Sequence, residues 1–190
     1  MTQAGQLRLR SDRLTTPIGV LLLLQDDDGR LRALDWEDFA ARMDRLLRLH
    51  YGPTGVEVRP GDGDTAAVQS LRRYFAGDLT AIDALAVATA GTPFQRRVWR
   101  ALRGIAVGST ITYAELARRI GQPTAFRAVG LANGANPIGI VVPCHRVIGS
   151  NAALTGYGGG IERKRWLLAH EGAGAASLPA PPRARGASAG

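Results

Sequence analysis

The front of the chain carries a pattern that predicts a β-hairpin. Residues 18–25 form an almost continuous apolar run, which is typical of a buried strand. Residues 26–29, Asp-Asp-Asp-Gly, are a turn signal, and a second strand is expected over 30–36. Strands joined by so short a turn pair antiparallel, so we predict a hairpin at this end of the protein.

A helical period follows the hairpin. From Asp38 the apolar positions repeat as on one face of a helix, which Gly52 is expected to end. Residues 56–58 are a short strand candidate, and Asp64 is expected to cap another helix. No cluster of polar residues suggests chemistry here, so residues 1–88 are predicted to be a scaffold domain. The residues expected to face inward from the two helices are Phe39, Met43, Leu46, Leu47, Val68, Leu71 and Phe75.

The second half carries two capping boxes, which mark the starts of helices. Residues 92–95 are Thr-Pro-Phe-Gln, with proline at the first helical position, and residues 112–115 are Thr-Tyr-Ala-Glu. A Gly-Gln-Pro turn ends the second of these helices, and Thr124 is expected to cap a third helix over 125–133. Two short helices joined by such a turn predict a helix-turn-helix, whose second helix usually meets DNA.

The surface expected on that second helix is unusual for a reader of DNA sequence. It offers the small residues Ala125, Ala128 and Gly130, with Arg127 as its single cation. Reading base edges in the major groove normally takes several long polar side chains. Small residues instead let the backbone approach a partner closely, which disfavours a sequence-specific regulator.

The C-terminal third is expected to form a pocket loop, a last helix and a tail. Residues 149–160 are dense in glycine, which suits a loop beside a flat ligand. A helix over 161–171 has Lys164 among the residues of its polar face, and Gly172 is expected to end it. Residues 173–190, rich in Ala, Gly, Pro and Ser, are predicted to be a disordered tail.

These elements predict an α/β (α+β) fold of two domains. The first is a small α/β domain with an antiparallel hairpin, over residues 1–88. The second, over residues 89–172, is mostly helical and contains the helix-turn-helix. With 190 residues, 45% of them hydrophobic, the chain is long enough for a core of ordinary size.

Composition narrows the class of protein. The formal net charge of +8 favours a polyanionic partner, although arginine richness also follows from a GC-rich genome. No apolar run approaches the roughly 18 residues that span a bilayer, and the N-terminus lacks a signal-peptide pattern. A cytoplasmic protein without a membrane partner is therefore expected. One cysteine excludes an internal disulfide, and no zinc-type spacing is present, so neither a metal nor another cofactor is expected.

Cys144, the single cysteine, has a histidine directly after it. A lone cysteine is more often a small buried apolar residue than a nucleophile. A thiol becomes nucleophilic as thiolate, and His145 reaches the sulfur directly or through one water if the two lie in a turn. Glu171 is an acid able to orient that histidine, and a Cys–His–Glu set is a recognised way of activating a thiol.

The region around Cys144 resembles the methylated-DNA–protein-cysteine methyltransferases, also called O6-alkylguanine-DNA alkyltransferases. The similarity covers roughly the second half of the chain, in order and in spacing. The front half resembles the family only in its hairpin-and-helix pattern. The motifs that carry the resemblance are 92–95, Tyr113, Arg127-Ala128-Val129-Gly130, Asn136-Pro137, Pro143-Cys144-His145-Arg146-Val147, Gly156-Tyr157 and 166–172.

The resemblance implies a reaction in which each protein molecule acts once. Cys144 takes the alkyl group from O6-alkylguanine, or from O4-alkylthymine, after the base has been flipped out of double-stranded DNA. His145 deprotonates the thiol through a water, Glu171 orients His145, and Asn136 fixes the turn that carries the cysteine. Tyr113 supports the departing base through a hydrogen bond.

The resemblance also implies how DNA is held. The helix of small residues lies in the minor groove, and Arg127 fills the space that the flipped base leaves. The protein is expected to act as a monomer, with cooperative binding along DNA left open. The implied DNA-contacting residues are Thr124, Ala125, Phe126, Arg127, Ala128, Gly130, Leu131, Asn133 and Gly134. Those implied to line the base pocket are Tyr113, Val147, Thr155, Gly156, Tyr157 and Gly158.

Two residues depart from the family pattern, and their effect stays open. Three alternative functions also stay open. Ala152 stands where relatives usually have glycine, and Phe126 places a large ring on the DNA-facing helix. The main alternative function is a lesion-binding protein that transfers nothing and recruits other repair factors, against which the presence of Cys144 speaks. A helix-turn-helix transcription factor and a cysteine hydrolase with multiple turnovers are the other two.

Overall fold

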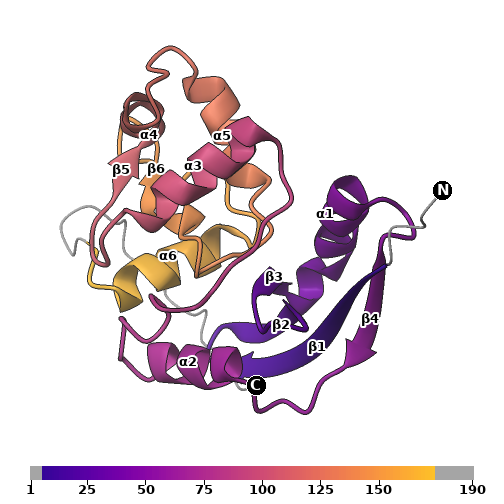
Figure 1. Ribbon diagram of the computed structural model, residues 1–190. Helices are drawn as coiled ribbons and strands as arrows, with labels where there is room; N and C mark the ends of the chain where they lie inside the picture. The colour runs from indigo at the N-terminus through magenta and orange to yellow at the C-terminus, as the bar shows by residue number, and fades with distance from the viewer. Residues whose placement is uncertain (1–5, 174–190) are drawn as a thin grey trace, which may run out of the picture.

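The front half of the chain folds into a four-stranded mixed sheet with two helices (Figure 1). The computed structural model describes residues 6–173. The strand order is β3-β2-β1-β4, in which β1 pairs antiparallel with β2 and parallel with β4. The predicted hairpin is confirmed as β2 and β3. The strands are β1 (Leu7–Thr16), β2 (Gly19–Asp26), β3 (Leu31–Trp36) and β4 (Val56–Pro60).

Strand β1 has no counterpart among the sequence predictions. Its buried positions are Leu9, Asp12 and Leu14, and charged or polar residues occupy most of the others. A buried aspartate breaks the alternation of apolar and polar residues by which a strand is recognised. Pairing with β2 and β4 on its two sides, rather than its own pattern, makes this segment a strand.

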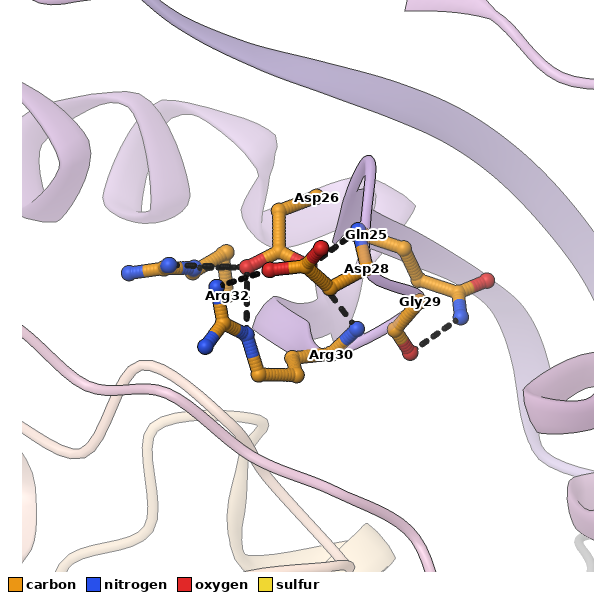
Figure 2. Close-up of polar contacts among 6 residues, drawn as sticks. All are labelled: Gln25, Asp26, Asp28, Gly29, Arg30 and Arg32. Carbon is orange, nitrogen blue, oxygen red and sulfur yellow. Dashed lines mark hydrogen bonds and ion pairs between the residues drawn. The ribbon is translucent and has the colours of Figure 1, made fainter.

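A polar network closes the turn between β2 and β3 (Figure 2). The Asp26 carboxylate accepts the backbone N–H of Asp28 and of Arg30, and it also accepts from the guanidinium groups of Arg30 and Arg32. Burial would raise the pKa of Asp26, but these donors outweigh it and lower the pKa. Gln25 Nε2 donates to the carbonyl of Gly29 at 2.9 Å. The predicted Asp-rich turn is therefore held by its own first aspartate.

The two front helices follow the predicted periodicity, with one error at a cap. Thr65, not Asp64, caps α2, since its hydroxyl accepts the Val68 N–H while Asp64 accepts from the Gln69 side chain. Helix α2 also buries Tyr74 completely, whereas Phe75, predicted to face inward, is only partly buried. The front helical segments are η1 (Glu37–Phe39), α1 (Ala40–Tyr51) and α2 (Ala66–Phe75).

The C-terminal half is mostly helical, as predicted. The capping box at Thr92 is present in full, and Thr112 caps the next helix by accepting the Glu115 N–H. Thr124 does not cap the third helix, because Ala125 occupies the cap position without a side-chain bond. The helices are α3 (Pro93–Arg103), α4 (Tyr113–Arg119), α5 (Phe126–Gly134), η2 (Cys144–Arg146) and α6 (Ile161–His170), with β5 (Ile111–Thr112) paired to β6 (Val147–Ile148).

The two halves share one hydrophobic core. Leu34 of β3 pairs with Ile138 just before the cysteine segment, and Leu31 pairs with Val87 of the connecting segment. One continuous cluster of buried apolar residues joins the sheet, α2, α3, α5 and α6. Helix α2 lies beside α6, where Phe75 packs on Trp166 with ring centroids 5.8 Å apart (Figure 1). The boundary between residues 88 and 89 stays a prediction.

The chain turns sharply after α6. Gly172 adopts a left-handed conformation with φ +73°, and the N–H of Ala173 returns to the Leu168 carbonyl at 2.8 Å. Gly172 therefore ends the helix as predicted. Ala173 is buried, and the rest of the predicted tail, residues 174–190, lies outside the described residues. Between residues 6 and 173, no helix is long and apolar enough to cross a membrane.

Ala152 is one of two non-glycine residues with positive φ in the described part of the chain, at +60°. A Cβ atom disfavours this conformation, so replacing it by glycine relieves strain, while the larger entropy of glycine in the unfolded chain offsets part of the gain. Ala152→Gly is therefore expected to raise the free energy of unfolding by a net of about 0.5–1 kcal/mol. Urea denaturation measures the change. Ala153→Gly is the control, because Ala153 lacks a positive φ, and this variant should lower the free energy of unfolding. If Ala152→Gly lowers it by the same amount, Ala152 is not strained.

Candidate functional site

Asn136 shapes the segment that carries the cysteine. Its side-chain Nδ2 donates to the carbonyls of Val142 at 2.8 Å and Ile138 at 3.2 Å, and its Oδ1 accepts the Ile138 N–H at 3.0 Å. Asn136 is buried, and these three bonds close the loop that delivers Cys144 to the first position of η2. A single side chain thus satisfies backbone groups that no helix or sheet ladder pairs.

His145 and Arg146 converge on one carboxylate. Glu171 Oε1 lies 2.9 Å from His145 Nε2 and 2.9 Å from Arg146 Nη2, while Oε2 lies 2.8 Å from Arg146 Nε. Arg146 also donates to the carbonyl of Ile105 at 2.6 Å. All three side chains are almost completely excluded from solvent. Together with Cys144, we call these residues the cysteine cluster.

The electrostatics of the cysteine cluster fix the protonation of its members. Burial would raise the pKa of Glu171, but hydrogen bonds from His145 and Arg146 hold the pKa well below its usual range. Burial lowers the pKa of His145 despite the nearby carboxylate. A carboxylate only accepts, so the neutral imidazole carries its proton on Nε2 and keeps the lone pair on Nδ1. Nδ1 is buried and has no hydrogen-bond partner among the described residues.

The thiol of Cys144 is protonated at rest. Its side chain is buried, and burial raises the pKa of the thiol, with partial opposition from Asn136, Arg42 and Lys164. A buried thiol needs a base to become a nucleophile. The unprotonated Nδ1 of the neighbouring His145 is a base within the same short helical turn.

Lys164 was predicted on the polar face of the last helix, and this placement is wrong. Its side chain is fully buried, and Nζ donates to the carbonyls of Val147 at 2.6 Å and Thr155 at 2.9 Å. Burial lowers its pKa to about 8. The ammonium group thereby ties the segment after Cys144 to the glycine-rich loop. The sequence shows only a charged helix position, and such positions are usually exposed.

Most of the predicted pocket residues belong to that loop, and Tyr113 and Val147 contact it or lie beside it. The Tyr113 hydroxyl donates to the Thr155 carbonyl at 3.5 Å, and the Tyr157 ring stands edge-on to His145 at 6.4 Å between centroids. Gly156 is exposed with a positive φ. Val147 is completely buried, with its carbonyl bonded to Lys164, so its part in a pocket stays a prediction.

The front half contributes residues that the sequence prediction left out. Arg42 pairs with Asp35 at 2.5 Å and donates to the carbonyls of Gly134 at 2.7 Å and Asn136 at 3.0 Å. A Cβ atom on Gly158 would lie 2.6 Å from the Arg42 guanidinium, so a side chain there would displace this group. Tyr74 donates to Glu171 at 2.8 Å. Two side chains of the front half thus bond to residues of the second half near Cys144, while the interpretation of residues 1–88 as a scaffold domain stays a prediction.

Most of the residues predicted to contact DNA lie on or just before the outer face of α5, with one exception. Phe126 and Leu131 are exposed, at 47% and 78%, and the Arg127 guanidinium lies 5.9 Å from the Phe126 ring. Asn133 points inward instead, and its Nδ2 donates to the Cys144 carbonyl at 3.4 Å. Asn133 is thus placed in the core beneath the helix. Thr124, Ala128 and Gly134 are exposed, while Ala125 and Gly130 are partly exposed.

Comparison with known proteins agrees with this arrangement. Residues 93–173 match the family model described as 6-O-methylguanine DNA methyltransferase, DNA binding domain. The methylated-DNA–protein-cysteine methyltransferase of Salmonella typhimurium is 53% identical over 166 residues, which cover 87% of this chain and 97% of that protein. The one of Methanosarcina acetivorans is 45% identical over 83% of this chain and 94% of its own.

A solved structure extends the likeness to three dimensions. The crystal structure of Mycobacterium tuberculosis OGT in complex with DNA superposes with a TM-score of 0.72 at 45% identity, covering 87% of this chain and 92% of that one. Sequence and fold therefore agree over both halves of the chain. The chain belongs to the methylated-DNA–protein-cysteine methyltransferase family.

Proposed function

We propose that this protein repairs DNA by direct reversal, taking the alkyl group of O6-alkylguanine, and of O4-alkylthymine, onto Cys144. The observation that carries the proposal is the buried Cys144 thiol followed by His145, whose imidazole is held by Glu171 at 2.9 Å. The proposed partner is double-stranded DNA, approached through its minor groove by a single protein molecule in the cytoplasm.

His145 prepares the thiol. Because Glu171 accepts the Nε2 proton, the free lone pair on Nδ1 takes the proton of Cys144 through a water. Glu171 stabilises the imidazolium that forms.

Alkyl transfer is a displacement at carbon. The Cys144 sulfur attacks the alkyl carbon, an S–C bond forms, and the C–O bond to the guanine breaks with its electron pair staying on the base. The Tyr113 hydroxyl supports the developing negative charge by hydrogen bonding. The guanine regains a proton at its ring nitrogen, which balances the proton removed from the thiol. A thioether does not return the alkyl group, so each molecule reacts once.

The damaged base must leave the helix before Cys144 can reach it. Flipping costs a few kcal/mol of unstacking and unpairing. Arg127 is an exposed cation on α5, beside the Phe126 ring, and it fills the vacated stack. The apolar residues Phe126 and Leu131 on the same helix suit the floor of a minor groove. DNA binding then depends on shape and phosphates more than on sequence.

Arg127→Ala tests the flipping role. The variant is expected to react with O6-methylguanine in duplex DNA about 10-fold or more slowly than wild type, because about 1.4 kcal/mol of support for the flipped state corresponds to a factor of ten. Reaction with free O6-benzylguanine should be nearly unchanged. Rates are followed by loss of the labelled methyl or benzyl group. Equal slowing of both reactions would contradict the role.

Wild-type protein tests the function itself. Incubation with a duplex oligonucleotide that contains O6-methylguanine should add one methyl group per protein molecule, as measured by intact mass. Persistence of the lesion with tight binding would favour a lesion-binding protein that transfers nothing. Many equivalents repaired per molecule would favour a hydrolase, and strong sequence preference would favour a regulator. Affinity should fall steeply with salt, because the contacts are mainly to phosphates.

A further inference from the structure

One side chain from the front half reaches the cysteine cluster. Tyr74, near the end of α2, is completely buried, and its hydroxyl donates to Glu171 Oε1 at 2.8 Å. Phenylalanine would fill a core position equally well, since a buried hydroxyl costs free energy unless it is bonded. Within residues 6–88, Tyr74 is the one residue whose side chain bonds to a side chain of the cysteine cluster.

Tyr74 is held in place by the residue that precedes its partner. The Tyr74 carbonyl accepts from His170 Nε2 at 2.8 Å, and its ring packs edge-on against the His170 ring at 5.2 Å between centroids. His170 is the last residue of α6, and Glu171 follows it. The last residue of α6 and the residue that caps it thus contact one tyrosine, which fixes α2 against the end of α6.

The oxygen that Tyr74 contacts is crowded with donors. Glu171 Oε1 accepts from Tyr74, from His145 Nε2 at 2.9 Å and from Arg146 Nη2 at 2.9 Å. A carboxylate oxygen has about two lone-pair sites, so the three donors compete for it and each donor weakens the hydrogen bonds of the other two. Burial and the charge of Glu171 raise the pKa of Tyr74, so the phenol stays protonated and acts as a donor.

We propose that Tyr74 is a positioning residue for the transfer reaction: it orients Glu171 and limits how strongly this carboxylate draws a proton onto His145. The kinetic part of this inference rests on the proposed function. The hydrogen-bond arrangement itself exists in the protein without substrate. The front half of the chain then completes the site through α2, in addition to packing against it.

Tyr74→Phe tests this role, because it removes the hydroxyl and keeps the ring. Without this donor, Glu171 pairs more strongly with the His145 N–H and the imidazolium is favoured. The acid limb of the pH–rate profile for methyl transfer is therefore expected to move up by about half a pH unit. In NMR spectra of the unreacted variant, the proton on His145 Nε2 should move downfield as its bond to Glu171 strengthens.

Val68→Ala is the matched control, because Val68 is buried in the same helix and does not contact Glu171 through a hydrogen bond. It should reduce stability while leaving the pH profile and the Nε2 proton resonance in place. If Tyr74→Phe also leaves the resonance in place, Tyr74 is a packing residue and the inference is wrong. A wild-type protein that transfers no methyl group would overturn the proposed function, whereas the resonance would still decide the role of Tyr74.

Discussion

Cys144→Ala is expected to abolish methyl transfer completely. In the proposed reaction the sulfur forms the new bond, and Cys144 is the single cysteine of the chain, so no other thiol can replace it. Alanine keeps the small apolar volume of a buried site and adds no unpaired polar group, so the fold should be retained. After incubation with a duplex containing O6-methylguanine, intact mass should show no added methyl group, compared with one for wild type.

The same variant separates binding from chemistry. Affinity for the damaged duplex should stay within a few-fold of wild type, since the exposed face of α5 is unchanged. Peptide mass analysis of the wild type should place the methyl group on the peptide that contains Cys144. A methyl group found on any other residue, or repair by Cys144→Ala, would contradict the assignment of Cys144 as the acceptor.

Glu171→Gln is expected to reduce both stability and rate. The change leaves the buried Arg146 guanidinium without its counter-ion, and breaking a buried ion pair in this way costs about 3–5 kcal/mol. The amide also loses the charge that stabilises protonated His145, so methyl transfer should slow by about 100-fold, within the range typical of acid–base catalysis. Urea denaturation and single-turnover kinetics measure the two effects.

The loss of stability at acid pH gives an independent check on Glu171. The pKa of this carboxyl is held low in the folded protein, so protonation favours the unfolded chain. Its contribution is complete above the ordinary glutamate pKa of 4.5 and is lost as the pH falls below that value. The lowered pKa of His145 acts in the same direction, beginning below its ordinary value of 6.5. In the Glu171→Gln variant, the free energy of unfolding should therefore depend less on pH below pH 4.5.

Glu162→Gln is the control for these measurements. Glu162 lies in the first turn of α6, the helix that Glu171 caps at its other end. Its side chain is exposed and pairs with Arg165 on the surface. Surface ion pairs contribute about 0–1 kcal/mol, so neither stability nor rate should change appreciably. A Glu171→Gln variant with the stability and acid profile of Glu162→Gln would show that the buried network does not stabilise the fold.

Local rules placed most elements correctly. The hairpin, the helical faces and the capping box at Thr92 follow from patterns a few residues long, so they can be recognised without knowing the tertiary partners. The wrong predictions concern segments whose structure depends on contacts with other parts of the fold. Strand β1 depends on pairing on two sides, and the cap at Thr124 fails because the backbone of the preceding turn starts α5 one residue later.

By itself, the sequence determined the candidate chemistry: one thiol next to His145, with Asn136 and Glu171 at fixed spacings. It also determined the small-residue helix that carries Arg127. Only the tertiary structure decided which groups surround these residues. Tyr74, Arg42 and Lys164 reach the site from segments far away in the chain or from a position that looks exposed.

The physical reason lies in what burial requires. A buried charge or hydroxyl is tolerated when it finds a partner, and the partner is set by packing between helices and sheet, not by spacing along the chain. Asn133 illustrates the limit: the sequence predicts it among the DNA contacts of α5, but its side chain turns inward to the Cys144 carbonyl. The candidate nucleophile can therefore be predicted from the sequence, whereas the groups that set its pKa and orientation are decided by the fold.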